Sequence, residues 1–226
     1  MGLITGVLST QCAFSNQAST GYVDGAIANL RHELTNKMDT RINELTRSVN
    51  QLPLVTHSIG EIFQGGIIFY VDESKQHGLM VSFNDLEPEV EWRNGEGGDR
   101  IVNARAQGLG AGETNTRLII SQQTIDGQEG QFAALNAANY QISADGKTPC
   151  LTPNTGESIC YGGWYLPSLN ELLLLHANLK NGLSNSRYWS SSEVSTNEAW
   201  LVDFSSGEAL IQEKSTPASV RAIHAF

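Results

Sequence analysis

Basic residues are scarce in this chain. Its 226 residues hold 14 Lys and Arg against 24 Asp and Glu, a formal net charge of −10. Proteins that bind nucleic acid without sequence preference need a basic surface to neutralise phosphates, so the composition argues against that class of partner. Hydrophobic residues make up 40% of the chain and charged residues 17%, which indicates that most of it folds. The length allows one good-sized core and an extension.

Long apolar runs and a basic N-terminal region are also missing. No run approaches the roughly 18 apolar residues of a membrane-spanning helix, so we expect no membrane span. Residues 3–8 are mildly apolar, but no Lys or Arg precedes them. A secretory signal normally has that basic start and a longer apolar stretch. We therefore expect residues 1–21 to be an N-terminal tail that is disordered rather than helical.

Cysteine is limited to three residues. Cys12 is interpreted as a free or interchain thiol. Cys150 and Cys160 bracket a turn-rich loop, which a disulfide could close easily in an oxidising compartment. A metal site is the alternative, but it needs further Cys or His ligands nearby, and the sequence shows none at a suitable spacing. We predict a disulfide between Cys150 and Cys160.

Recognisable catalytic motifs are absent. The run Ser190-Ser191-Ser192 is not part of a Gly-x-Ser-x-Gly elbow and has no identifiable His partner. We interpret it as an aromatic-serine loop whose hydroxyls bond to backbone groups. His176 lies in a Leu-rich segment and is interpreted as a structural residue. The Asp and Glu residues form no recognisable glycosidase pair. We predict that the protein is not an enzyme.

Residues 22–53 form the first clear element, an amphipathic helix. Its apolar positions follow one another at intervals of three or four, and they are Val23, Ile27, Leu30, Leu34, Met38, Ile42, Leu45, Val49 and Leu52. This is a heptad seam with a stutter around Met38, and Pro53 ends it. The narrow stripe favours a self-associating stalk over a helix packed on its own domain. The Ile and Leu positions alone do not decide between two and three chains.

From residue 60 the periodicity changes to that of a mixed α+β domain, which we assign to residues 60–226. Ser168 and Glu171 have the spacing of a helix N-cap and its capping-box partner. The expected elements are a strand hairpin at 65–72 and 78–83, an ordered loop at 84–112, helices at 114–123, 131–139 and 169–179, a second hairpin at 200–204 and 208–213, and a closing strand at 219–225.

The order of glycine and aromatic positions along this domain resembles a known family. The motifs that carry the likeness are Gly65-Gly66-Ile67-Ile68-Phe69-Tyr70-Val71, Gly78-Leu79-Met80-Val81, Glu91-Trp92, residues 108–116, Gly162-Gly163-Trp164-Tyr165-Leu166-Pro167, Tyr188-Trp189-Ser190-Ser191-Ser192 and Ser219-Val220-Arg221. Together they resemble the C-terminal domain family of the Legionella collagen-like protein. The resemblance implies an extracellular, trimeric domain of bacterial adhesins that binds sulfated glycosaminoglycans and supports aggregation and biofilm.

The same motifs are more distantly similar to C-type-lectin-like folds. The resemblance therefore implies a C-type-lectin-like head on an N-terminal trimeric coiled coil. The chain departs from the adhesin in having no Gly-x-y tract. It also lacks the calcium-lectin sugar motifs, because Glu87-Pro88 is followed by Glu and no Trp-Asn-Asp partner is present. A standard calcium-bridged sugar site is not expected.

A sulfated glycan requires cationic side chains, since Arg and Lys bind sulfate through charge-assisted hydrogen bonds. The densest supply lies within 25 positions of a loop-rich segment, at Arg93, Arg100, Arg105 and Arg117. Threefold repetition would give such a patch avidity for a polymer. The alternative is local pairing of these arginines with neighbouring carboxylates. If the patch lies elsewhere, the candidates are Lys75, Lys180 and Lys214.

Two other charged groups have structural interpretations. Arg221, between apolar neighbours of the closing strand, is expected to be partly buried and paired with a carboxylate such as Glu171 or Glu193. An acidic run could hold calcium through oxygen ligands, but it lacks the fixed spacing of a calcium loop, so we expect a solvated loop and no cofactor. Its members are Glu87, Glu89, Glu91, Glu96 and Asp99.

Together with the resemblance, the sequence predicts a homotrimeric adhesin, extracellular or on the bacterial cell surface, whose head binds a sulfated glycosaminoglycan or a related anionic polysaccharide. The alternative is a trimeric structural or receptor-binding tip with a protein or another glycan as its ligand.

Overall fold

The computed structural model describes residues 8–51, 54–86, 89–125, 130–150, 159–179 and 182–226. The chain divides after Leu54 into an N-terminal unit and a head. Within the described residues, no helix combines the length and the apolar character needed to cross a membrane.

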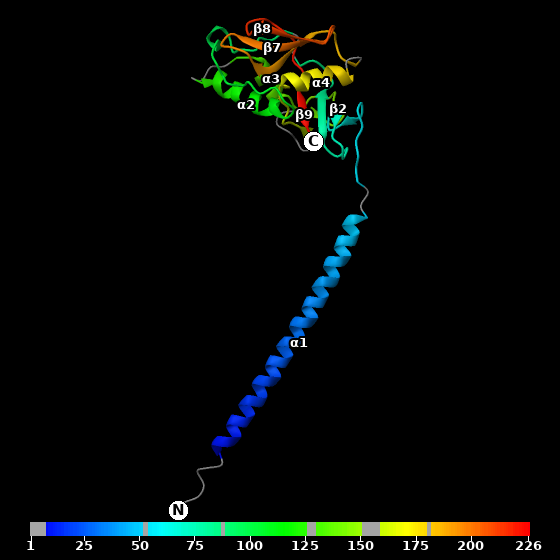
Figure 1. Cartoon of the computed structure of the whole chain (residues 1–226), viewed down its shortest axis with the longest axis vertical. Coiled ribbons are helices and arrows are strands. Elements are labelled where there is room, and N and C mark those ends of the chain that lie inside the picture. Colours follow the sequence, from blue (N-terminus) through cyan, green and yellow to red (C-terminus); the bar gives the residue numbers. More distant parts are fainter. Residues whose placement is uncertain (1–7, 52–53, 87–88, 126–129, 151–158, 180–181) are drawn as a thin grey trace, which may run out of the picture. The chain divides into compact units, whose positions relative to one another are not determined.

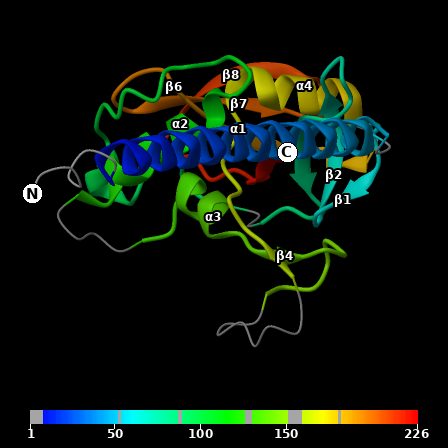
Figure 2. The same ribbon diagram turned by 90° about the horizontal axis from the view of Figure 1, so that it is seen from below.

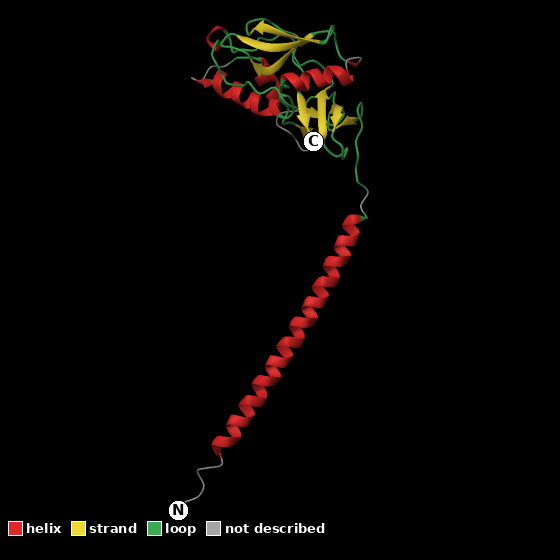
Figure 3. Ribbon diagram, viewed as in Figure 1, coloured by secondary structure: helices red, strands yellow, loops and turns green. Residues whose placement is uncertain are grey.

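The N-terminal unit is a single helix, α1 (Leu8–Asn50), drawn as an unbroken helix in Figure 3. It begins well before residue 22, so the prediction of a disordered tail is wrong for residues 8–21. The reason is that helix propagation costs little once a turn has formed, and no proline interrupts this segment. The predicted apolar stripe is solvent-exposed: its members from Val23 to Val49 have exposed fractions between 45% and 63%. Leu52 and Pro53 lie outside the described residues.

Among its described residues, the head contains three sheets, in which every strand pair is antiparallel. The first has the order β1-β2-β3-β9, with strands at Ile62–Phe63, Gly66–Val71, Gly78–Ser82 and Ile223–Ala225. The second has the order β6-β7-β8, at Arg187–Glu193, Glu198–Asp203 and Glu208–Glu213. The third pairs β4 (Ile142–Ser143) with β5 (Cys160–Tyr161). Both predicted hairpins are therefore confirmed.

In the part of the head that the structure describes, helices α2 (Ala111–Gln123), α3 (Ala133–Asn139) and α4 (Leu169–Leu179) and the 3-10 turn η1 (Glu96–Gly98) accompany the sheets. Helix α4 lies between the two larger sheets (Figure 1), where Leu172 and Leu175 pack with side chains of both sheets. A second apolar cluster surrounds Trp92 and Trp189 and includes residues of α2 and α3. The α+β class is confirmed, and the C-type-lectin-like assignment remains a prediction.

Strand β6 corrects the prediction of an aromatic-serine loop. Its tail, Ser190 to Ser192, is fully buried in the strand rather than exposed in a loop. The hydroxyls do bond to backbone groups as expected: Ser190 Oγ donates to the Trp200 carbonyl at 2.9 Å and Ser192 Oγ to the Ala106 carbonyl at 2.9 Å. These bonds allow a serine run to occupy a buried strand, because each hydroxyl is satisfied.

The predicted capping box of α4 is confirmed and has a wider role. The buried Glu171 carboxylate accepts the backbone N–H of Ser168 at 2.7 Å, and the Ser168 hydroxyl accepts the Glu171 N–H at 3.4 Å. The carboxylate also accepts the N–H groups of Gly110 at 2.8 Å and Gly112 at 3.2 Å. One carboxylate thus joins the start of α4 to the start of α2.

This arrangement predicts a large effect of an isosteric substitution. Glu171→Gln replaces one acceptor oxygen by a donor that faces backbone N–H groups, so the free energy of unfolding of the head should fall by about 2–4 kcal/mol. Urea unfolding followed by tryptophan fluorescence measures it. The matched control is Glu113→Gln on the exposed face of α2, where a change below about 1 kcal/mol is expected. Equal losses from the two variants would contradict the role of Glu171.

Candidate functional site

The predicted arginine patch is largely neutralised within the head. Arg93 Nε donates to Glu91 Oε2 at 3.0 Å, its terminal nitrogen pairs with Asp99, and its side chain is only 13% exposed. The hydrogen bond with Glu91 raises the pKa of Arg93, with further contributions from the charges of Glu91 and Asp99. Arg100 donates to the carbonyls of Gln122 at 3.2 Å and Gly97 at 3.0 Å. Both arginines hold loops in place.

The other two members of the patch remain accessible. Arg105 is 55% exposed and lies 3.9 Å from the Glu193 carboxylate. Arg117 is 76% exposed and forms an ion pair with Glu113 one turn earlier on α2. The Arg117–Glu113 pair is exposed and contributes little to stability, and Arg105 is only at the edge of contact with the buried Glu193. Both guanidinium groups therefore remain free to contact a polyanion.

Among the three lysines predicted as alternative contacts, Lys214 cannot reach a ligand in solution. Its side chain is 0% exposed, and its ammonium donates to Glu193 Oε1 at 2.8 Å, the Arg100 carbonyl at 3.0 Å and the Thr196 carbonyl at 2.9 Å. It also lies 4.6 Å from the centre of a Trp92 ring. Burial lowers the pKa of Lys214, and the bond to Glu193 acts in the opposite direction. The prediction of Lys214 as a ligand-binding residue is therefore wrong.

The two remaining lysines differ in what the structure says of them. Lys75 is exposed in the turn between β2 and β3 and adopts a positive φ of 59°. Lys180 lies outside the described residues. Lys75 stays a candidate for contact with a charged polymer.

Arg221 is buried and paired, as predicted, but with another carboxylate. Its Nε donates to Asp85 Oδ1 at 2.5 Å, and a terminal nitrogen donates to the Ser82 carbonyl at 2.6 Å. Glu171 and Glu193 are committed elsewhere, to backbone N–H groups and to Lys214. Asp85 also accepts the Tyr188 hydroxyl at 2.8 Å. The sequence did not indicate Asp85, because it lies 136 positions from Arg221.

The predicted disulfide between Cys150 and Cys160 is present, with the two Cα atoms 6.0 Å apart. The loop that it closes, residues 151–158, lies outside the described residues, as does the side chain of Cys12.

The acidic run gives no metal cluster among the residues that the structure describes, where no three His, Cys, Asp or Glu side chains converge. Glu87 lies outside them. Glu91 and Asp99 are instead partners of Arg93.

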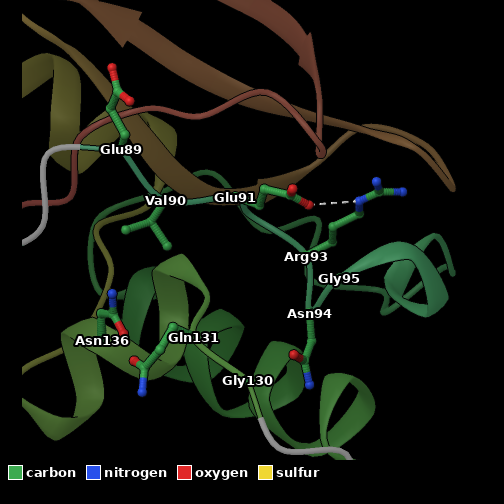
Figure 4. A pocket seen from close by; sticks show the side chains of 9 residues that line it. All are labelled: Glu89, Val90, Glu91, Arg93, Asn94, Gly95, Gly130, Gln131 and Asn136. Atoms are coloured by element: carbon green, nitrogen blue, oxygen red, sulfur yellow. Dashed lines mark hydrogen bonds and ion pairs between the residues drawn. The ribbon is translucent and has the colours of Figure 1, made fainter.

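A polar cavity of about 590 Å³ lies on the head (Figure 4). One wall is the segment 89–95, and the opposite wall comes from residues 130–131, just before α3, and from the middle of α3. The lining residues are Glu89, Val90, Glu91, Arg93, Asn94, Gly95, Gly130, Gln131 and Asn136. Figure 4 shows the Glu91–Arg93 ion pair along one wall and the amides of Gln131 and Asn136 on the other.

A second cavity of about 460 Å³ adjoins the first, because Gln131 and Asn136 line both. Its lining includes the end of α3 and the start of β4, two elements labelled in Figure 2. Its other lining residues are Asn84, Asp85, Leu86, Asn139, Tyr140, Ile142, Gly146, Lys147 and Pro149. We call the two cavities together the amide groove. Burial raises the pKa of Tyr140, so its hydroxyl stays protonated and able to donate.

The wall at 90–94 is fixed by buried contacts. Trp92 Nε1 donates to the Ser190 carbonyl at 2.8 Å, and Trp189 Nε1 donates to the Val90 carbonyl at 2.9 Å. The Asn94 amide donates to the Gln123 carbonyl at 2.9 Å. These bonds tie the wall to β6 and to the end of α2. The groove is therefore preformed.

The turn at the far end of the groove is held by Asp145. Its carboxylate accepts the N–H groups of Lys147 and Thr148 at 2.9 Å and the Thr148 hydroxyl at 2.6 Å. The pKa of Asp145 is lowered to about 2, chiefly by the hydrogen bond from the Thr148 hydroxyl. The turn keeps its charge, and hence its shape, over the whole neutral range.

Sequence reasoning missed the amide groove. Its amides come from three separate stretches of chain, and single Asn and Gln residues carry no recognisable spacing. The one local signal was the position of Gln131, Asn136 and Asn139 around an otherwise alanine-rich helix.

No protein-family model matches the chain, and no curated protein matches its sequence. Its function is therefore inferred from the geometry of α1 and of the head.

The buried pair of Lys214 and Glu193 predicts a stability effect. Lys214→Met keeps an apolar side chain beside Trp92 but leaves Glu193 buried without its cation, so the free energy of unfolding should fall by about 3–5 kcal/mol. Chemical denaturation measures it. The control, Lys147→Met at an exposed position, should change stability by less than about 0.5 kcal/mol. A Lys214→Met variant as stable as the parent would show that the ion pair contributes nothing.

Proposed function

We propose that the chain is an extracellular, non-enzymatic adhesin in which α1 assembles three copies and each head binds a polysaccharide. The observation that carries this proposal is the exposed apolar stripe of α1. A row of large aliphatic side chains half in water along one helix is unfavourable for a monomer, and exposed apolar rows of this kind mark interaction sites.

The apolar stripe of α1 packs against the same stripe on α1 of other copies of the chain. The spacing of three and four residues is that of a coiled-coil seam, in which each side chain inserts between four residues of a facing helix. The surface of α1 has an apolar depression along this seam, lined by Leu34, Met38, Ile42 and Leu45. Polar residues flank the seam, including the ion pairs Glu33–Lys37 at 2.9 Å and Arg41–Glu44 at 3.3 Å. The choice of three chains rests on the family resemblance.

The side chains that could suggest catalysis have structural partners. Ser190 and Ser192 are buried and donate to backbone carbonyls. His176 bonds through Nε2 to the Phe204 carbonyl at 3.2 Å and packs edge-on against the Phe204 ring. A nucleophile needs a base within reach and an open face toward the substrate, and these groups offer neither. This supports binding rather than turnover.

A sulfated polymer remains the proposed ligand, with a reduced set of contacts. Arg105 and Arg117 are exposed guanidinium groups in the predicted segment, and Lys75 is an exposed ammonium. Two or three cations per head are weak alone, but three heads on one stalk present them repeatedly to one chain, which raises the avidity.

A second candidate is a structural or receptor-binding tip whose ligand is a protein or another glycan. It is favoured by the internal pairing of Arg93 and the burial of Lys214, which leave the acidic head with few free cations.

The stalk proposal predicts loss of assembly on seam substitution. Ile27→Gln with Leu30→Gln keeps good helix formers but removes two apolar side chains, each worth roughly 1.5–3 kcal/mol per chain when buried. Sedimentation velocity should show a shift from trimer toward monomer. The control pair His32→Gln and Asn36→Gln, on the face opposite the seam, should leave the trimer intact. An unchanged mass of the seam variant would place assembly in the head.

The ligand proposal predicts that neutralising two arginines weakens binding to immobilised heparin. Arg105→Gln with Arg117→Gln should lower the affinity at least tenfold and reduce its dependence on salt, because fewer counterions are displaced. Surface plasmon resonance at graded salt measures both, with circular dichroism as the folding control. Arg187→Gln with Arg47→Gln, in the last turn of α1 and away from its apolar stripe, removes the same charge elsewhere and should bind like the parent. Equal binding by both variants would place the charged site elsewhere.

A further inference from the structure

We infer that the amide groove is a second ligand site, and that it binds an uncharged polysaccharide. The two adjoining cavities, of about 590 and about 460 Å³, each have the size of a small-molecule site. The inference rests on the lining of the groove and not on the arginines proposed to hold a sulfated polymer.

The lining is rich in amide side chains. Five of the described lining residues carry one, namely Asn84, Asn94, Gln131, Asn136 and Asn139. A carboxamide presents two donors and an acceptor side by side, and a hydroxyl also donates and accepts. Closely spaced sugar hydroxyls therefore match this lining. Tyr140, Ile142 and Pro149 add apolar surface for the C–H faces of a sugar ring.

The charges of the groove disfavour an anionic ligand. Three carboxylates line it, from Asp85, Glu89 and Glu91, against two cations. One cation, Arg93, is paired with two carboxylates. The other, Lys147, is exposed at the far end. A sulfated or carboxylated sugar would meet net negative charge, whereas an uncharged one incurs no such repulsion.

An unsatisfied donor marks the junction of the two cavities. Asn136 Nδ2 is buried and has no hydrogen-bond partner, the only such side-chain atom found among the described residues. Buried donors are nearly always paired, so an unpaired one indicates a missing acceptor. The terminal torsion of Asn is soft, so an acceptor oxygen in the groove can draw this amide toward it. Figure 4 shows Asn136 beside Gln131, opposite the wall at 89–93.

The wall across from Asn136 is already rigid. Asn94 Oδ1 lies so close to Gly130 that no side chain fits there, and the Asn94 N–H donates to Gln123 Oε1 at 2.8 Å. A ligand therefore meets fixed groups and costs little ordering entropy on binding.

The groove suits a polysaccharide better than an extended peptide. Peptides that add to a protein backbone use an open strand edge. Among the described lining residues only Ile142 lies in a strand, and the rest lie in loops or α3. The backbone groups of a peptide would find few partners here.

The test is binding of the full chain to immobilised neutral polymers: an α-glucan, a β-glucan, a mannan and a galactan. Binding is measured at about 0.5 M NaCl, where charge-driven contacts are screened. We expect at least one polymer to bind. Gln131→Ala with Asn139→Ala, two exposed positions, should weaken that binding at least tenfold, and Asn136→Ala should do the same.

The control is Gln107→Ala with Asn170→Ala, which removes two exposed amides outside the groove and should bind like the parent. Binding to none of the four polymers, or equal binding by groove and control variants, would overturn the inference. A peptide from a displayed library that binds the parent but not the groove variants, with no neutral polymer bound, would overturn the ligand class. Heparin binding by the groove variants should equal that of the parent, so failure here is distinct from failure of the charged site.

Discussion

Two buried glutamates hold together a part of the head that has almost no regular structure. Between η1 and α2 the chain runs through residues 99–110 without a helix or strand. Glu193 of β6 accepts the N–H groups of Val102 and Asn103, both at 2.8 Å, and Glu171 of α4 accepts those of Gly110 and Gly112. A backbone donor that folding removes from water is costly without an acceptor. These carboxylates therefore allow an irregular segment, exposed along most of its length, to pack Val102 and Ala104 into the core.

The rest of the head depends on that segment being fixed. Its carbonyls are satisfied by the same elements: Ser192 and Asn115 donate to Ala106, and Ser168 donates to Gln107 and Gly108. The segment thereby joins β6, α2 and α4. Strand β6 in turn fixes the wall of the amide groove through Trp92 and Trp189. A preformed groove is thus a consequence of how the core satisfies its polar groups.

The distribution of charge separates what holds the fold from what can meet a ligand. Lys214, Arg221 and Arg93 face carboxylates inside the head and stabilise loops. Arg105 and Arg117 remain on the surface. An acidic protein whose cations are mostly paired inside the fold presents few of them to a polyanion. It can bind a polyanion only by repeating these few cations on several copies, because one copy does not carry a dense patch. An uncharged ligand does not depend on that repetition.

The sequence by itself determined the local features. The amphipathic helix α1, the two hairpins, and the capping box of Ser168 and Glu171 each depend on residues a few positions apart, so spacing predicted them. The Cys150–Cys160 bridge was predicted from the turn-rich loop between the cysteines together with an oxidising compartment. It misplaced the start of α1, because propensity says little about how far a helix continues from a strong nucleus.

Only the tertiary structure decided which polar groups meet across the chain. Nothing in the sequence around Lys214 distinguished it from a surface lysine. Folding nevertheless places its ammonium against the Glu193 carboxylate and over the face of the Trp92 ring. Arg221 pairs with Asp85 and not with either of the expected glutamates. Strand β6 can be buried because carbonyls of Trp200 and Ala106 accept its serine hydroxyls. The amide groove belongs to the same class. Its walls come from segments that are separate in sequence, and only the packing of the core brings them face to face.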